Sequence, residues 1–178
     1  MNVLGQENRK NINILKSLNI LYAEDDLDLR ETTASLLRDL RFEVEECDNG
    51  KVALEAYQKN PFSYDIVITD LNMPFMNGIE LLKNIHLQNP DQAVMVVSAH
   101  NETEYFLESI RNNITGYILK PIDFEQLIDT LYKTAEMVNV RKENEVYKTK
   151  LQEMVEEKTV ALERSYEKMQ IGRAHVWT

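Results

Sequence analysis

The chain has 178 residues, of which 43% are hydrophobic and 28% are charged, with only five glycines and four prolines. This composition excludes disordered and collagen-like proteins and fits one soluble domain of ordinary size with an extension. The single cysteine, Cys47, excludes an internal disulfide and a cysteine-rich metal site. Apolar runs are short and the N-terminus lacks the apolar core of a secretory signal, so we expect a cytoplasmic protein.

The net charge of −10 is concentrated in the first 140 residues. These residues hold 12 Lys/Arg against 23 Asp/Glu, whereas residues 141–170 hold seven of each. An acidic surface repels the phosphate backbone of nucleic acids. We therefore expect neither direct nucleic-acid binding nor membrane binding by this segment.

Apolar segments alternate with amphipathic segments from residue 18 to about residue 137. The predicted strands are Leu18–Ala23, Phe42–Cys47, Asp65–Thr69, Ala93–Ser98 and Gly116–Leu119. The predicted helices are Asp28–Leu40, Gly50–Lys59, Gly78–Leu87, Glu102–Asn112 and one that begins at Asp123. Three of the strands are nearly continuous apolar runs, which is typical of inner strands covered on both faces. The alternation predicts an α/β fold, a doubly wound parallel sheet built from right-handed βαβ units.

The fifth predicted helix continues beyond the domain. No Gly or Pro occurs between Ile122 and Ile171, so we expect a helical extension over residues 138–170. Apolar side chains recur along it at spacings of three, four and seven residues: Leu151, Met154, Val155, Ala161, Leu162 and Met169. Lys158 and Ser165 interrupt this stripe. The pattern is typical of a coiled coil or signalling helix, and a solvated helix without a partner is the alternative.

The last eight residues, IGRAHVWT, break both the charge pattern and the apolar stripe. We interpret residues 171–178 as a non-native tail from a cloning or sequencing step, which leaves a natural chain cut near Gln170. The expected organisation is an N-terminal arm over 1–17, a domain over 18–137, a helical linker over 138–170 and this tail. We expect either an output domain beyond the linker or a stand-alone regulator that acts through a partner.

Acidic and basic side chains follow the predicted strands where each strand ends. Glu24 and Asp25 follow the first strand, Asp70 ends the third, Ser98 ends the fourth and Lys120 follows the fifth. The carboxyl ends of parallel strands meet at one edge of a sheet, so these residues are expected to lie together. Clustered carboxylates need a cation, and Mg²⁺ prefers such oxygen ligands. A lysine and a hydroxyl beside them favour transfer of a phosphoryl group to a carboxylate.

Residues 18–137 resemble the receiver domains of response regulators in two-component signalling, the CheY-like superfamily. Four segments in order carry the resemblance: ILYAEDDLDLRE, DIVITDLNMPFMNG, VVSAH and GYILKP. The resemblance implies a flavodoxin-like (βα)5 fold with strand order 2-1-3-4-5 and Mg²⁺ as cofactor. It also implies that a sensor histidine kinase or a phosphotransfer protein supplies the phosphoryl group.

The resemblance further implies a role for each acidic residue of the group. Asp70 would accept the phosphoryl group and would also be a metal ligand. Asp25 would bind Mg²⁺ directly, Glu24 would act through a bound water, and the backbone carbonyl of Asn72 would be a further ligand. Asp26 is left open, as an exposed acid or as another member of the pocket.

The remaining residues of the resemblance belong to the response to phosphorylation. Ser98 would hydrogen-bond the phosphoryl group, and Lys120 would form an ion pair with it across a cis bond to Pro121. Tyr117 would turn inward as Ser98 moves. Asn72 and His100 would influence how fast the phosphoryl group is lost, and we hypothesise that His100 controls the access of water.

Two positions depart from the commonest family pattern without removing a needed group. Glu24 replaces a frequent aspartate and keeps the charge, and Ser98 replaces a frequent threonine and keeps the hydroxyl. The site is therefore expected to be competent for its own phosphorylation and dephosphorylation. That does not make the chain a classified enzyme unless a downstream output domain is one.

The expected function is a phosphorylation-controlled switch. The switch would act through the face of the fourth helix, fifth strand and fifth helix, with homodimers formed through that face and/or the linker helix. Similar linkers lead into diguanylate cyclases, histidine kinases or phosphatases, so the output stays open.

A degenerate receiver that only docks or dimerises is the main alternative. A dehalogenase-type phosphatase lacks its second acid, because Asn72 stands there, and a flavin protein would need a phosphate-binding loop where EDD stands.

Overall fold

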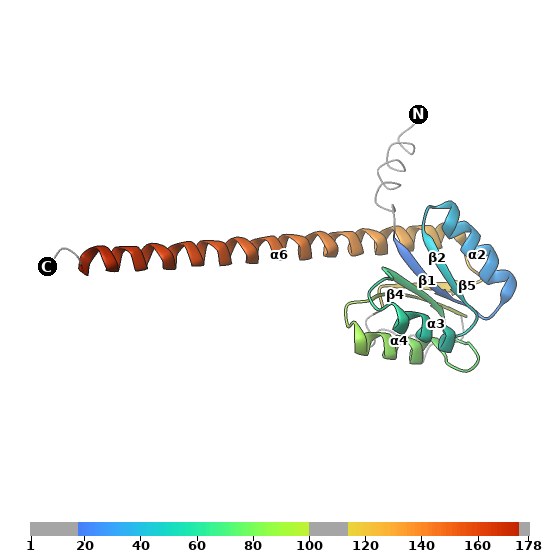
Figure 1. Cartoon of the computed structure of the whole chain (residues 1–178). Helices are drawn as coiled ribbons and strands as arrows, with labels where there is room; N and C mark the ends of the chain where they lie inside the picture. The colour runs from blue at the N-terminus through green and yellow to red at the C-terminus, as the bar shows by residue number, and fades with distance from the viewer. Residues whose placement is uncertain (1–17, 100–113, 175–178) are drawn as a thin grey trace, which may run out of the picture. The chain divides into compact units, whose positions relative to one another are not determined.

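The structure is a computed structural model that describes residues 18–99 and 114–174, with side chains described up to residue 170. The strands are β1 Asn19–Ala23, β2 Glu43–Cys47, β3 Ile66–Asp70, β4 Ala93–Ala99 and β5 Gly116–Lys120 (Figure 1). The helices are α2 Leu27–Asp39, α3 Gly50–Lys59, α4 Gly78–Gln88 and α6 Phe124–Ala174. Each predicted strand and helix boundary of the domain is confirmed within one residue in the described part, whereas the helical extension predicted to end at residue 170 continues to Ala174. The predicted helix Glu102–Asn112 lies outside the described residues.

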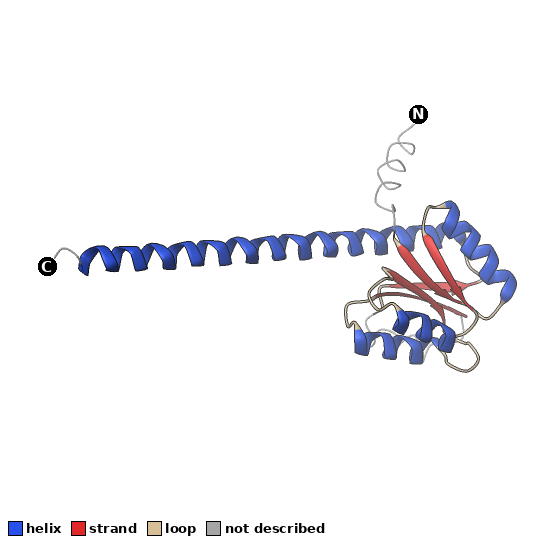
Figure 2. Ribbon diagram, viewed as in Figure 1, coloured by secondary structure: helices blue, strands red, loops and turns tan. Residues whose placement is uncertain are grey.

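The five strands form one parallel sheet in the order β2-β1-β3-β4-β5, which confirms the predicted topology (Figure 2). The strand order reverses at β1, which pairs with β2 on one side and β3 on the other. Crevices outside the carboxyl ends of strands at such a reversal are where doubly wound folds bind ligands. The ends of β1 and β3 are therefore the place to search for a site.

Helices cover both faces of the sheet because alternate strand side chains point to opposite faces. On one face, Ile20 and Ile68 pack with Leu37 of α2 and with Leu127 and Leu131 of α6. The opposite face packs against α3 and α4, through a set that includes Leu21, Val67, Ala53, Leu82 and Ile85. This double cover explains why β1, β3 and β4 are nearly continuous apolar runs.

Side-chain caps start three of the helices next to the carboxyl edge of the sheet. The Asp26 carboxylate accepts a hydrogen bond from the backbone of α2, and the Asn49 amide oxygen does the same for α3. Asn77 and Glu80 form a reciprocal capping box at the start of α4. Such caps satisfy backbone donors that have no partner within the helix, so they fix where each loop ends.

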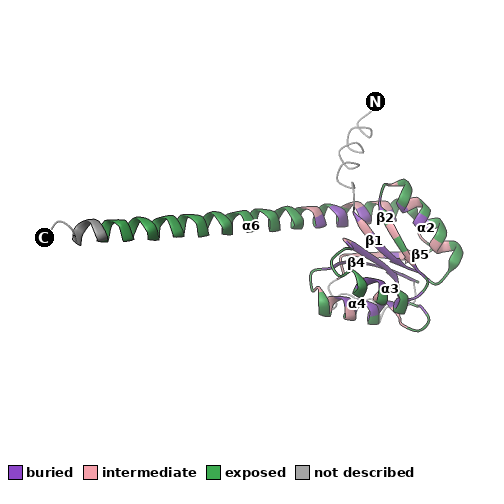
Figure 3. Cartoon of the chain, viewed as in Figure 1, coloured by how far each residue is buried: buried purple, intermediate pink, exposed green. Residues whose placement is uncertain are grey.

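The chain divides into two compact units, residues 1–138 and residues 139–178, and α6 contributes to both. In the first unit, α6 buries four hydrophobic side chains: Leu127, Leu131, Ala135 and Val138. In the second unit, every residue from 140 to 170 is exposed (Figure 3). The predicted continuation of this helix is confirmed. Among the helices described, none combines the length and hydrophobicity needed to cross a bilayer.

Candidate functional site

Three carboxylates meet at the edge of the sheet where the strand order reverses. Glu24 and Asp25 directly follow β1, and Asp70 is the last residue of β3. Carboxylate oxygens of the three residues lie within 4.8 Å of one another. Glu24 is fully buried and Asp70 is 5% exposed, whereas Asp25 is exposed. The cluster therefore places two desolvated negative charges beside a third that solvent and partners can reach.

Lys120, the last residue of β5, supplies a cation to this cluster. Its Nζ lies 2.6 Å from Asp70 Oδ2 and 3.0 Å from Glu24 Oε1. Burial lowers the pKa of Lys120, but its hydrogen bonds to Asp70 and Glu24 outweigh this effect and leave the pKa raised. The ammonium group is therefore protonated at neutral pH. It links β5 to Asp70 and Glu24, which lie 50 and 96 residues away in sequence.

The Glu24 side chain is suited to bind a second cation in addition to Lys120. Burial and the nearby Asp70 charge raise its pKa, although Lys120 opposes this shift. Its Oε1 faces Lys120, while Oε2 is buried without a hydrogen-bond partner in the described part of the chain. A buried, unpartnered carboxylate oxygen is costly. Because hard oxygen ligands suit Mg²⁺, the three carboxylates fit this metal ion.

Arg30 of α2 holds the acidic loop, and the sequence did not identify it. Its Nη1 donates to the Glu24 carbonyl at 2.7 Å and to the Asp25 carbonyl at 3.5 Å. Its Nε lies 3.9 Å from Glu46 Oε2 on β2, a carboxylate that Arg38 also contacts at 2.7 Å. The sequence does not distinguish Arg30 from an ordinary surface arginine of a helix, because its contacts depend on how α2 is placed against the acidic loop.

The loop after β3 packs closely against the backbone of Asp70. The Asn72 backbone N–H lies 3.4 Å from Asp70 Oδ1, and its side chain is exposed. Gly78 donates its backbone N–H to the Leu71 carbonyl at 2.9 Å. A Cβ added at Gly78 would lie 2.2 Å from the Asp70 carbonyl oxygen, which is closer than real contacts allow. Gly78 is thus a second residue that supports the site.

The predicted switch residues lie on the two strands at the other side of Asp70. Ser98 of β4 is buried, and its Oγ lies 3.2 Å from the Ala99 carbonyl oxygen. Tyr117 of β5 pairs in register with Val96 and is half-buried against the hydrophobic layer of α3 and α4. His100 lies outside the described residues.

Two smaller expectations are resolved at this edge. The Lys120–Pro121 peptide bond is cis, as the family resemblance implied. Asp26 is the N-cap of α2, where its Oδ1 accepts a hydrogen bond from the Leu29 backbone at 2.9 Å. The described carboxylate cluster consists of Glu24, Asp25 and Asp70, so Asp26 acts as a cap.

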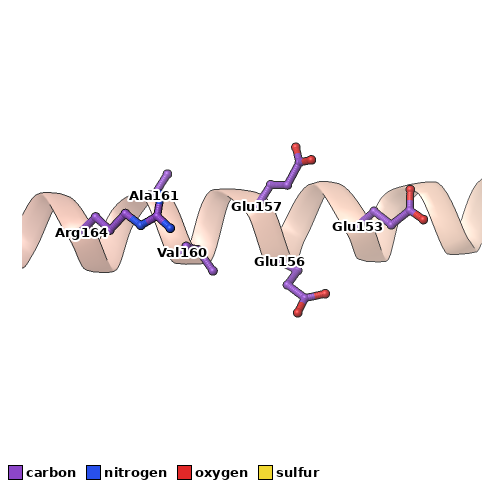
Figure 4. Close-up of a pocket in the computed structure, with 6 residues that line it drawn as sticks. All are labelled: Glu153, Glu156, Glu157, Val160, Ala161 and Arg164. Atoms are coloured by element: carbon purple, nitrogen blue, oxygen red, sulfur yellow. The ribbon is translucent and has the colours of Figure 1, made fainter.

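A surface hollow on α6 has a different character. Figure 4 shows the six side chains that border it: Glu153, Glu156, Glu157, Val160, Ala161 and Arg164. All six come from successive turns of one helix, and they fan out from more than one side of it. A single helix cannot enclose a small ligand, so this hollow is not a candidate active site.

Comparison with known sequences agrees with the geometry of the site. A family model described as "Response regulator receiver domain" matches residues 20–132. The chemotaxis protein CheY-3 of Vibrio cholerae is 37% identical over 124 residues, which cover 68% of this chain and 94% of that protein. The transcriptional regulatory protein ZraR of Escherichia coli K12 is 32% identical over 117 residues, covering 66% of this chain but only 26% of that protein.

Solved structures show the same fold. The V. cholerae chemotaxis protein CheY4 superposes with a TM-score of 0.61 at 28% identity, covering 66% of this chain and 98% of that one. The N-terminal domain of a Wolinella succinogenes protein superposes with a TM-score of 0.63 at 29% identity, covering 70% of this chain and 98% of that one. The chain belongs to the family of response regulator receiver domains of two-component systems.

Proposed function

We propose that Asp70 accepts a phosphoryl group and that its phosphorylation switches the receiver between two states. The observation that supports this proposal most strongly is the environment of the Asp70 carboxylate. Its carboxylate is 5% exposed, lies 2.6 Å from Lys120 and shares a cation-binding cluster with Glu24 and Asp25. A nucleophile placed between a fixed cation and metal-binding oxygens is suited to phosphoryl transfer.

In the proposed reaction, a carboxylate oxygen of Asp70 attacks the phosphorus atom of a phosphohistidine. The new P–O bond forms as the P–N bond breaks, and the electron pair leaves with the imidazole of the donor. Lys120 stays close enough to pair with the transferred oxygens, because it already contacts Asp70. Glu24, Asp25, Asp70 and the Asn72 carbonyl would hold Mg²⁺, which when bound offsets the negative charge on the phosphoryl oxygens.

The same residues give the switch a physical basis. The transferred group adds close to two negative charges beside Asp70. Ser98 would donate its hydroxyl to the phosphoryl group and Lys120 would pair with it, while Tyr117 would repack toward the space that Ser98 leaves. His100, two residues after Ser98 in the sequence, would set the rate of phosphoryl loss by limiting the access of water.

The proposed partners follow from this chemistry. A sensor histidine kinase or a phosphotransfer protein would supply the phosphoryl group. Two copies of the chain would pair through the face of the predicted helix Glu102–Asn112, β5 and α6, and/or through the helical linker over residues 138–170. The acidic receiver would not bind nucleic acid directly and would act in the cytoplasm. The receiver would carry out its own phosphorylation and dephosphorylation, and the output would come from another domain or a partner.

The alternative function is a degenerate receiver that serves only for docking or dimerisation. Intact mass spectrometry after incubation with Mg²⁺ and a small phosphodonor separates the two. We expect the mass of about one phosphoryl group to be gained, and to be lost when a chelator is present. Asp70→Asn should gain none, while the matched control Asp65→Asn, changed at the opposite end of β3, should gain the same mass as the unmodified chain. No incorporation in the unmodified chain would support the degenerate receiver.

A further inference from the structure

The second unit of the chain carries large hydrophobic side chains on a helix that is exposed on all sides. Leu151 is 63% exposed and Leu162 is 58% exposed, and both lie among charged neighbours. Burial of such a side chain against a partner is favourable, because it removes apolar surface from water. An isolated helix gains little from propensity alone, so its stability normally comes from packing of its apolar face. These side chains therefore define a surface that a partner is expected to cover.

The first half of this surface follows a seven-residue repeat. Met137, Asn144 and Leu151 occupy the first core position, called a, and Val140 and Tyr147 occupy the second, called d. Alternating steps of three and four residues keep these side chains on one stripe. In the described helix all of them are exposed, which is unusual for a stripe that contains four hydrophobic residues out of five.

After Leu151 the repeat lengthens to eleven residues without losing the stripe. Leu151, Val155 and Lys158 are followed, eleven positions later, by Leu162, Tyr166 and Met169. An inserted step of four residues locally unwinds a coiled coil, and an eleven-residue repeat keeps the stripe nearly straight or slightly right-handed. The longer repeat takes Ser165 off the stripe, whereas Lys158 stays on it as a single charged core position.

The charges beside the stripe favour a parallel partner of the same sequence. In a parallel pair, the residue just before a core position a on one helix faces a residue of the other helix. That second residue is the one just after the following core position d. Glu136 then faces Arg141, and Glu143 faces Lys148, in both directions across the pair. An antiparallel pair would instead bring Arg141 toward Lys148, which are both basic.

Asn144 adds a second argument for the same arrangement. It is the one amide side chain in the first five core positions of the stripe, between Val140 and Tyr147. An asparagine at a single a position is known to select a two-stranded, in-register pair, because its amide can be satisfied only by the matching amide of the other helix. A shifted or antiparallel pair would place this amide against a hydrophobic side chain.

We propose that residues 137–169 form a parallel, in-register, two-stranded coiled coil with a second copy of the chain. This inference deepens the homodimer of the proposed function and does not depend on phosphoryl transfer. Two chains in register would place two receivers at the same end of one coiled coil. The change in repeat near Leu151 would be the part of the coil most easily over- or underwound.

Disulfide trapping of the full chain tests the orientation and the register together. Cys47→Ser removes the single native thiol, and one cysteine is then introduced per variant. Tyr147→Cys and Leu162→Cys lie on the stripe, and their matched controls Thr149→Cys and Glu163→Cys lie off it. We expect covalent dimers from both stripe variants under mild oxidation, with yields at least about fivefold above the controls, as core positions of a parallel coil require.

An antiparallel pair cannot align residue 147 with itself and residue 162 with itself at once, so failure of either stripe variant would overturn the proposal. Equal trapping in stripe and control variants would overturn it as well. Sedimentation equilibrium gives an independent test, in which Leu151→Asp should raise the dimer dissociation constant at least about tenfold and Gln152→Asp should not. Both variants should still gain one phosphoryl group, so failed pairing and failed phosphorylation are distinguishable.

Discussion

Arg30 is the residue that joins the acidic loop to the edge of the sheet. Its guanidinium donates to the carbonyls of Glu24 and Asp25 and faces Glu46 of β2. Its side chain is 14% exposed, so these contacts are shielded from water. Because the two carbonyls belong to the proposed metal-binding residues, Arg30 holds the backbone that carries their carboxylates. Residues that orient metal ligands commonly change metal affinity ten- to a hundredfold.

We therefore expect Arg30→Gln to weaken Mg²⁺ binding about tenfold. Isothermal titration calorimetry with Mg²⁺ measures this without any phosphodonor. Arg38→Gln is the matched control, since Arg38 contacts the same Glu46 carboxylate but not the acidic loop. Equal Mg²⁺ affinity in Arg30→Gln and the unmodified chain would show that the loop keeps its shape without this arginine.

Cys47 offers a prediction about pH at the same scale. Burial raises the pKa of the Cys47 thiol to about 12, and the carboxylates of Glu45 and Asp48 act in the same direction. A raised thiol pKa means that Cys47 keeps its proton to higher pH. At pH 8 the fraction of Cys47 present as the reactive thiolate is therefore about a thousandfold lower than for an unperturbed thiol. Alkylation of the native chain at pH 8 should be slower than that of the guanidinium-unfolded chain by at least this factor. Equal rates would mean that β2 opens readily.

At the scale of the elements, the loop between β3 and α4 depends on a close backbone approach at Gly78. A methyl group there would meet the Asp70 carbonyl oxygen at 2.2 Å, so the loop or β3 must shift. We expect Gly78→Ala to lower the free energy of unfolding by about 1–3 kcal/mol, as overpacking does. It should also slow phosphoryl incorporation by the folded protein, because the backbone that shifts carries the acceptor Asp70.

Gly116→Ala is the control for this prediction. Its added Cβ would meet the side chains of Thr130 and Met95, not the backbone of the site. It should reduce stability in a denaturant titration without slowing phosphoryl incorporation. If Gly78→Ala and Gly116→Ala slow incorporation equally, the close approach at Gly78 has no specific role in the site.

Within the whole molecule, sequence predicted the features that follow from apolar patterns and from the common edge of parallel strand ends. The strands could be located because runs such as those around Val67 and Val94 are covered on both faces, and the strand order followed from the family resemblance. Glu24, Asp70 and Lys120 could be placed together because the carboxyl ends of parallel strands share one edge.

The features that sequence missed arise from close contacts within the loops at the edge of the sheet, between residues that lie near one another in the chain. Arg30 reaches the acidic loop only because of the path of α2, and Gly78 is constrained by a backbone it meets in space. The cap role of Asp26 had a sequence signal, an acidic residue directly before an apolar-periodic segment, but the neighbouring Glu24 and Asp25 obscured it. Contacts set by tertiary geometry leave no periodic pattern in the chain, so they require the structure.

The proposed switch depends on phosphorylation of Asp70 itself. The most direct measurement is borohydride reduction after incubation with Mg²⁺ and a small phosphodonor, followed by tandem mass spectrometry of the peptides. Reduction converts an acyl phosphate into an alcohol, so we expect homoserine in place of Asp70, at a level that matches the phosphoryl group gained by the intact chain. Homoserine in place of Asp25, 5-hydroxynorvaline in place of Glu24, or unreduced Asp70 in a chain that carries the phosphoryl mass, would contradict it.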